Sequence, residues 1–160
     1  MISLQVGASG ETIVLPNQVL EHFWRNRQFR WWHREAGGSL FARIEQQLIT
    51  IEAVTGPRPT DQRTRYSYSP DRLAEQREIE AFYKHDLHYV GDWHTHPEKI
   101  PVPSGTDERT MASRVLESKH QLRGFVFAIV GNGPLPDGLT VVVHDGTQWY
   151  PLQKQGESAA

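Results

Sequence analysis

Residues 93–107 read WHTHPEKIPVPSGTD and follow the apolar run 87–91 (LHYVG), which predicts a β-strand. Side chains two positions apart on a strand point to the same face, so His94 and His96 direct their imidazoles toward one point. The chain then turns at a proline and returns Asp107 from the start of a predicted helix. Two imidazoles and one carboxylate leave a tetrahedral zinc ion one ligand short, as in catalytic metal sites. The stretch therefore predicts a zinc hydrolase.

The composition points to one soluble domain. The chain has 160 residues, a formal net charge of -2 and no cysteine, and this length suits one domain with its own core. The lack of cysteine excludes a disulfide framework, a thiol nucleophile and a cysteine-ligated zinc. Neither the charge nor the hydropathy pattern indicates a nucleic-acid or membrane partner, and no signal peptide is recognisable. We therefore expect a cytoplasmic protein.

Helical and strand patterns interleave along the chain. We expect strands at 2–6, 12–15, 38–44, 48–54, 125–130 and 139–143, with 148–150 closing the sheet. Helices are expected from Pro16, from Pro70 and over about 104–120. We expect the first helix to bury Val19, Leu20, Phe23 and Trp24, and the second to bury Leu73, Ile79, Phe82 and Tyr83. This order predicts a single α/β domain over residues 1–152, followed by a polar tail at 153–160.

Each part of the histidine stretch also has a simpler interpretation. A lone strand histidine is usually structural, and the chain contains eight histidines. Ser104 and Asp107 alone describe a helix start, with a serine N-cap and an acid in the first turn. Their occurrence together at fixed spacing favours metal binding, and a capped helix would hold Asp107 rigidly.

The pattern H-x-H-P-x6-S-x-x-D resembles the signature of the JAMM (JAB/MPN) metalloprotease family, with Thr95 between the histidines. The family places a glutamate before a glycine-rich apolar segment, and residues 34–38 (REAGG) match that element. Glu35 is therefore the expected glutamate, because its rivals Glu45 and Glu52 do not precede a glycine pair. The resemblance implies an α-β-α sandwich with a mixed central sheet, layered as in the cytidine deaminases.

The resemblance also implies a role for each residue. One zinc ion per chain would be held by His94, His96 and Asp107 with a water molecule, whose pKa a bound metal lowers from ~15.7 to about 7. Glu35 would accept a proton from this water as general base and pass it to the departing amine. Ser104 would donate a hydrogen bond to the carbonyl oxygen as it becomes an oxyanion.

Residues 91–98 (GDWHTHPE) further resemble small bacterial JAB proteins of antiphage operons, notably the CBASS systems that make cyclic-oligonucleotide signals. This implies a zinc-dependent isopeptidase or peptidase that cleaves the amide bond between a C-terminally conjugated protein and its target. The expected partner is a protein with an extended C-terminal tail, such as a CD-NTase (the nucleotidyltransferase of CBASS) or a ubiquitin-like protein.

Other classes of protein were weighed against this one. A catalytically silent MPN scaffold or interaction module remains the alternative, although all five expected site residues are present. A zinc nucleobase deaminase needs a P-C-x-x-C element, which a chain without cysteine cannot supply. An H-E-x-x-H peptidase is excluded because no such run occurs.

Residues 25–34 (RNRQFRWWHR) form a basic and aromatic cluster with three interpretations. We favour a helix end with buried aromatic rings and solvated arginines. A docking surface for an acidic protein partner is the second, because aromatic and arginine side chains anchor interfaces. A nucleic-acid surface with Trp31 and Trp32 as stacking platforms is the third.

Residues 63–66 are expected to border a groove for an extended substrate tail. Trp93 is expected to line the core or a cleft.

Overall fold

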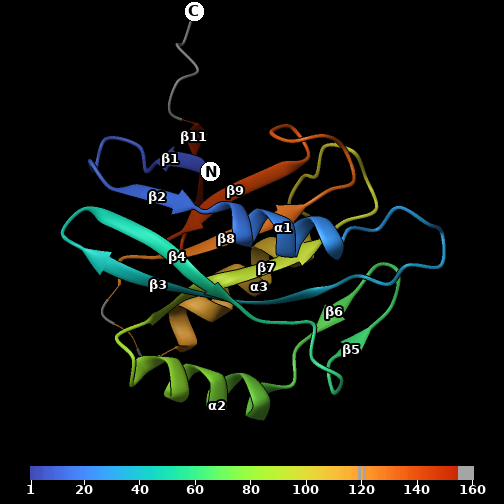
Figure 1. Ribbon diagram of the computed structural model, residues 1–160, viewed down its shortest axis with the longest axis horizontal. Helices are drawn as coiled ribbons and strands as arrows, with labels where there is room; N and C mark the ends of the chain where they lie inside the picture. The colour runs from blue at the N-terminus through green and yellow to red at the C-terminus, as the bar shows by residue number, and fades with distance from the viewer. Residues whose placement is uncertain (119, 121, 155–160) are drawn as a thin grey trace, which may run out of the picture.

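The computed structural model describes residues 1–118, 120 and 122–154 as a nine-stranded sheet with three helices and a small two-stranded sheet (Figure 1). The helices are α1 (Asn17–Arg25), α2 (Arg72–Tyr83) and α3 (Gly105–Glu117). The large sheet contains β1 (Ile2–Gln5), β2 (Thr12–Leu15), β3 (Gly37–Glu45), β4 (Leu48–Val54), β7 (His88–Thr95), β8 (Phe125–Val130), β9 (Leu139–His144), β10 (Trp149–Pro151) and β11 (Gln153–Lys154). The small sheet pairs β5 (Gln62–Arg63) with β6 (Tyr68–Ser69). No described helix is long and apolar enough to cross a membrane.

The large sheet is mixed, in the order β10-β9-β8-β7-β3-β4-β2-β1-β11. Strands β7 and β8 run parallel, as do β2 and β4, whereas the other neighbours are antiparallel. His94 of β7 pairs with Gly37 of β3 on one side and with Ile129 of β8 on the other. The strand that carries the first histidine is thus hydrogen-bonded along both edges and forms a rigid mount.

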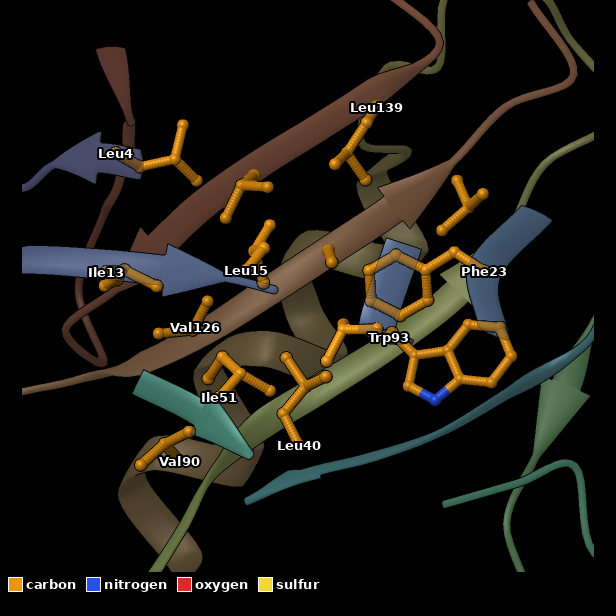
Figure 2. Close-up of a cluster of buried hydrophobic side chains, with 14 of the residues drawn as sticks. Leu4, Ile13, Leu15, Phe23, Leu40, Ile51, Val90, Trp93, Val126 and Leu139 are labelled. Atoms are coloured by element: carbon orange, nitrogen blue, oxygen red, sulfur yellow. The ribbon is translucent and has the colours of Figure 1, made fainter. Parts of the chain in front are cut away.

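Strand β8 separates two apolar layers because its side chains alternate between the faces of the sheet. Val126, Ala128 and Val130 join a core with α1, and Figure 2 shows this core around Trp93 and Phe23. The alternate residues of β8, led by Phe127, pack with Met111 of α3 in a second core. The expected α-β-α sandwich with a mixed central sheet is therefore confirmed.

The two outermost strands of the sheet, at opposite ends of the strand order, are consecutive in the chain, and the sheet must therefore be strongly curved. Only Leu152 separates β10, which pairs with β9, from β11, which pairs with β1 at the other end of the strand order. The Leu152 backbone N–H donates to Val141 O at 3.1 Å. The sheet thus includes residues 153–154 of the expected polar tail, while residues 155–160 lie outside the described part of the chain.

Two helices bury different residues from those expected. On α1, Val19 and Phe23 are buried, but Trp24 is half exposed. On α2, Leu73 and Tyr83 are exposed, Ile79 and Phe82 are only partly buried, and the buried residue is Glu75. The prediction was wrong for Leu73 and Tyr83, because charged groups from distant parts of the chain line the space beneath this helix and pair with its acidic side chains.

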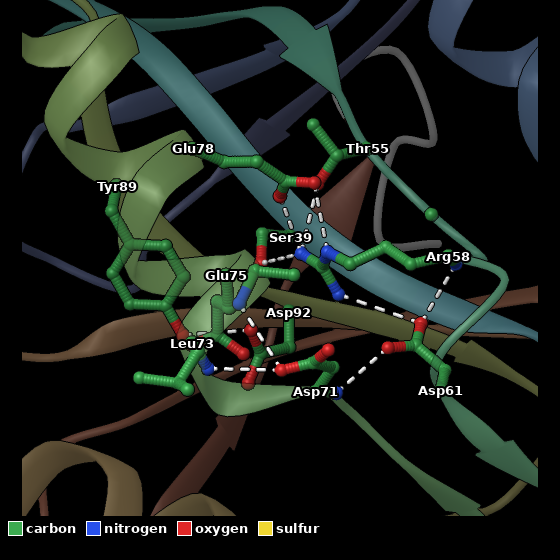
Figure 3. A network of polar contacts seen from close by, with 12 residues as sticks. Ser39, Thr55, Arg58, Asp61, Asp71, Leu73, Glu75, Glu78, Tyr89 and Asp92 are labelled. Atoms are coloured by element: carbon green, nitrogen blue, oxygen red, sulfur yellow. Dashed lines mark hydrogen bonds and ion pairs between the residues drawn. The ribbon is translucent and has the colours of Figure 1, made fainter.

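One of these charged groups is Arg58, which lies buried between α2 and the sheet (Figure 3). Its Nη2 lies 2.5 Å from Glu78 Oε2, and its Nη1 lies 3.5 Å from Asp61 Oδ2. Nη2 also donates to Ser39 Oγ on β3 at 3.2 Å. Although burial lowers the pKa of Arg58, its contacts with Glu78 raise that pKa above its usual value. Arg58 therefore joins α2 to the sheet as a buried cation.

Replacement of this cation tests its contribution to stability. We expect Arg58→Ala to lower the free energy of unfolding by about 3–5 kcal/mol, because it leaves the Glu78 and Asp61 carboxylates without their cation. Arg25→Ala is the control, because Arg25 and Glu21 form an exposed pair at 3.6 Å whose loss costs at most about 0.5 kcal/mol. Urea denaturation measures both, and equal losses would contradict a special role for Arg58.

Candidate metal site

His94 and His96 come together where β7 ends. Their Nε2 atoms lie 3.1 Å apart, as expected for side chains that share one face of a strand. His96 follows the last residue of β7, and its backbone N–H donates to Val130 O at 2.9 Å, so the ladder with β8 continues past the strand end. Both imidazoles are therefore fixed by backbone pairing.

The third expected ligand comes from the first turn of α3. Ser104 Oγ accepts from the Asp107 backbone N–H at 3.0 Å, and Asp107 Oδ2 accepts from the Ser104 backbone N–H at 2.9 Å, which forms a reciprocal capping box. The Asp107 carboxylate also reaches both histidines, with Oδ1 3.2 Å from His94 Nε2 and Oδ2 3.1 Å from His96 Nε2. The helix-cap interpretation of Asp107 is therefore confirmed, and the same side chain lies against both histidines, where the metal-ligand prediction requires it.

The spacing of these donor atoms fits a tetrahedral metal ion. Bonds of about 2.0–2.1 Å to a tetrahedral zinc place ligand atoms roughly 3.3 Å apart. The two Nε2 atoms lie 3.1 Å apart, and each lies 3.1–3.2 Å from a different oxygen of Asp107, so the three contacts are close to that value. Although burial raises it, hydrogen bonds with both histidines hold the pKa of Asp107 well below its usual range. The carboxylate is therefore available as an anionic ligand.

Glu35 brings a fourth polar group to this point from the segment before β3. A carboxylate oxygen of Glu35 and one ring nitrogen from each histidine lie within 4.8 Å of one another. Its backbone N–H donates to Thr64 O at 2.6 Å, and its carbonyl accepts from Arg63 Nε at 2.7 Å. Burial raises the pKa of Glu35, and the two histidines offset part of this rise. The rival Glu52 instead pairs with Arg43 at 3.0 Å, and Glu45 is exposed at the end of β3.

The glycine pair after Glu35 is required by close approach of neighbouring groups. A Cβ atom on Gly38 would lie 1.7 Å from Thr55 O, and one on Gly37 would lie 2.7 Å from the Tyr68 ring. Any side chain there would push β3 away from its neighbours and shift Glu35 from the histidines. This packing explains why the glutamate and the glycine pair occur together.

Two buried residues set the distance between Glu35 and the histidines: Thr95, which belongs to the motif, and Gln28, which the sequence did not single out. Thr95 Oγ1 accepts from the Ala36 backbone N–H at 2.9 Å and donates to Gln28 Oε1 at 2.7 Å. The Thr95 backbone N–H donates to Ala36 O at 2.8 Å. The hydroxyl required at position 95 was a signal in the motif, but no local pattern marks Gln28, whose partners are distant in sequence.

Glu98 also contributes to the site, and the sequence did not predict this role. Its Oε1 lies 2.8 Å from His96 Nδ1 and accepts from the Val102 backbone N–H at 3.1 Å. Although burial lowers the pKa of His96, its hydrogen bonds with Asp107 and Glu98 raise it to about 9. A carboxylate on Nδ1 leaves Nε2 as the metal-binding nitrogen and fixes the ring orientation.

A cavity of about 840 Å³ opens beside the four converging groups. The residues that line it include Tyr66, Ser67 and Tyr68. They also include the charged residues Glu75, Asp92 and Arg114. Arg114 Nε donates to Asp92 Oδ2 at 3.0 Å, and Arg114 also pairs with Glu75. Burial raises the pKa of Asp92 to about 7, and Glu75 adds to this rise. The cavity is large enough for several residues of an extended peptide.

The cluster at residues 25–34 does not have the arrangement that we favoured. Its aromatic rings are exposed rather than buried, with 78% exposure for Trp31, 59% for Trp32 and 55% for Phe29. The buried member is instead a cation, Arg27, at 5% exposure. The favoured interpretation was wrong because polar contacts, not apolar packing, hold this loop.

The expectation for Trp93 is confirmed, since it is buried in the core and borders the cavity.

Two histidines, an anionic carboxylate and a buried glutamate meet beside a cavity on a three-layer α/β fold, and metallohydrolases use donor sets of this kind. The chain matches, over residues 16–144, the family model described as prokaryotic homologs of the JAB domain, and it belongs to this family. It is a JAMM-type hydrolase.

Relatives of this chain carry names that agree with this class. A probable metalloprotease of Sinorhizobium fredii, y4qB, is 31% identical over 76% of this chain and 77% of its own length. A CD-NTase/cGAS isopeptidase of Pseudomonas aeruginosa is 31% identical over 74% of this chain and 77% of its own. A solution structure of a Desulfitobacterium hafniense protein superposes with a TM-score of 0.63 at 18% identity, over 87% of this chain and 88% of that one, which shows a shared fold.

The contact between Glu98 and His96 can be tested through metal affinity. We expect Glu98→Ala to weaken metal binding by roughly 10–100-fold, because His96 loses the acceptor that orients it. Glu98→Gln should lose less, since its amide oxygen still accepts from Nδ1. Competition with a chromophoric chelator measures both. Glu108→Ala removes an exposed carboxylate from the same helix turn as Asp107, and an equal loss in this variant would leave only a general charge effect.

Proposed function

We propose that this chain is a zinc-dependent isopeptidase that hydrolyses the amide bond between a C-terminally conjugated protein and its target. The observation that carries the proposal is the convergence of two imidazoles and one carboxylate at tetrahedral spacing, with a buried glutamate at the edge of the same cavity. We further propose that the reaction belongs to a bacterial ubiquitin-like or CBASS conjugation pathway in the cytoplasm. The name of the Pseudomonas aeruginosa relative, CD-NTase/cGAS isopeptidase, supports this substrate class.

In this proposal His94, His96 and Asp107 would hold the metal at the edge of the open cavity, where water can enter. A zinc ion in such a site supplies Lewis acidity and lowers the pKa of its water to about 7. The two histidines bind through Nε2, and Glu98 holds the proton on His96 Nδ1. Asp107 contributes the negative charge that partly neutralises the metal.

Glu35 acts as the general base. Its carboxylate is buried, and burial raises its pKa, which makes it a stronger base for accepting a proton and returning it to the departing amine. The backbone contacts with Thr64 and Arg63 hold the side chain at the edge of the cavity. A base that is fixed in this way needs little reorganisation when the substrate enters.

Ser104 stabilises the developing oxyanion. Its Oγ already accepts a hydrogen bond from the Asp107 backbone N–H, so its hydroxyl hydrogen remains available to donate. This hydroxyl borders the cavity next to the carboxylate of Asp107. A carbonyl oxygen of the substrate would receive this hydrogen bond as negative charge develops on it.

Metal content is the first test and needs no substrate. We expect about one zinc per chain in the parent and in Glu35→Gln, but little in His96→Ala, because only the last change removes a ligand. Native mass spectrometry and elemental analysis measure this directly. A parent protein that takes up no zinc on titration would overturn the metal assignment.

Cleavage is the second test, on a CD-NTase fused through its C-terminus to a reporter protein. We expect Glu35→Gln to lower turnover by about 10²–10⁴, and Ser104→Ala by about 10²–10³, while both keep the metal. Gel analysis and mass spectrometry identify the bond that is cut. Bound zinc without cleavage of CD-NTase or ubiquitin-like fusions would instead support a catalytically silent scaffold.

A further inference from the structure

We propose that the loop between α1 and β3, together with the turn between β5 and β6, docks an acidic face of the conjugated protein while its tail lies in the cavity. This inference rests on the proposed function and adds a recognition surface to it. The arginine–tryptophan surface comprises Trp24, Phe29, Arg30, Trp31, Trp32, Arg34, Arg65 and Tyr66.

The aromatic rings of this surface face solvent. Trp31 is 78% exposed and Tyr66 is 77% exposed, and the rings of Trp31 and Trp32 make an edge contact at 5.8 Å between centroids. Full burial of a large apolar side chain contributes about 1.5–3 kcal/mol, which these rings largely forgo in the free chain. Grouped exposed aromatic rings with arginines between them have the composition of a protein interface.

The loop beneath these rings is held in one conformation by polar contacts. Arg65 Nη1 donates to the carbonyls of Arg30 and Trp31 at 3.0 and 2.7 Å, and Gln28 Nε2 donates back to Arg65 O at 2.9 Å. His33 Nδ1 accepts from the backbone N–H groups of Phe29 and Arg30, both at 3.2 Å. The rings are thus presented on an ordered backbone, which lowers the entropic cost of binding.

The segment that carries most of this surface is cationic. Residues 24–34 contain four arginines and no acidic residue, although the whole chain carries a net charge of -2. Arg25 pairs with Glu21, but Arg27 is buried over the Phe29 ring at 4.1 Å, and its Nη2 has no hydrogen-bond partner among the described residues. Burial lowers the pKa of Arg27 to about 10, so it stays charged at neutral pH. This positive field favours an acidic partner.

The surface is continuous with the active-site cavity. Arg34 is followed directly by Glu35, and Tyr66 and Ser67 line the cavity. Gln28 connects the loop to Thr95, between the two histidines. Figure 1 shows the loop after α1 and the β5–β6 hairpin on the same side of the molecule. A partner seated on this surface can therefore extend a tail toward the metal site.

The charge of the cavity favours a protein over a nucleic acid as occupant. Carboxylates of Glu35, Glu75, Asp92, Glu98 and Asp107 line the region next to the arginine–tryptophan surface. Because only two arginines, Arg72 and Arg114, line the same cavity, a phosphate backbone that entered it would meet an excess of carboxylates, whereas a polypeptide tail carries no obligatory charge. The geometry therefore matches a folded acidic protein with an extended tail.

Binding of a simple probe tests the surface without any cleavage. The probe is a short fluorescein-labelled peptide rich in aspartate and glutamate, compared with a matched asparagine and glutamine peptide. We expect salt-sensitive anisotropy changes with the acidic peptide, weakened at least about tenfold in Trp31→Ala/Trp32→Ala and in Arg30→Glu/Arg34→Glu. The control variant, Leu73→Ala/Tyr83→Ala, removes exposed apolar side chains on α2 and should bind as the parent does. Equal binding of the two peptides, or unchanged binding in the surface variants, would overturn the proposal.

Steady-state kinetics then separate docking from chemistry. On a CD-NTase–reporter fusion, the surface variants should raise KM about tenfold with kcat retained. On a short peptide that holds only the tail and the scissile bond, they should match the parent. Equal losses on both substrates would show that the loop merely positions Glu35. If the parent cleaves neither substrate, the proposed function fails, and the peptide binding still decides the docking proposal.

Tighter binding of a single-stranded oligothymidine than of the acidic peptide would assign the surface to nucleic acid.

Discussion

The hydroxyl of Thr95 links three segments that are far apart in the chain, and the geometry of the site depends on it. It accepts from the Ala36 backbone N–H and donates to Gln28, at a position with no solvent exposure between the two histidines. An unpaired buried hydroxyl or amide is costly, so the two bonds strongly favour one spacing between Glu35 and the imidazoles. The same link fixes the base of the loop that carries the exposed tryptophans. The placement of Glu35 and the presentation of the aromatic surface therefore have one structural cause.

Electrostatic compensation explains how so many charges are held in and beside the cavity. Asp107 caps α3 and meets both histidines, so one carboxylate contacts both the helix start and the imidazole pair. Beneath α2, Arg58 and Arg114 form ion pairs with the acidic side chains on the inner face of the helix. Burying such groups is unfavourable unless each finds its partner, and the partners here come from different elements of the fold. The inner wall of the cavity is therefore polar and internally paired, with its arginines already engaged.

The sequence predicted those features that depend on local spacing. The histidine pair, the capped helix with Asp107 and the strand pattern of the sheet each lie within a few residues of one another, and the glycine pair after Glu35 marks a close approach that any side chain would prevent. The buried side of α2 could not be predicted, because Arg58 and Arg114 reach it from distant positions. The exposure of Trp31 could not be predicted either, because the hydrogen bonds by which Arg65 holds its loop join residues more than thirty positions apart.

The continuity of β10 and β11 through Leu152 has a consequence for behaviour in solution. A sheet ends in unpaired backbone groups, and long free edges recruit further strands into aggregates. Here the outermost strands are three and two residues long, and the curvature brings both into one short segment of chain. Little template is therefore left for edge-to-edge growth at either end of the described sheet, even though the same molecule exposes a patch of aromatic rings.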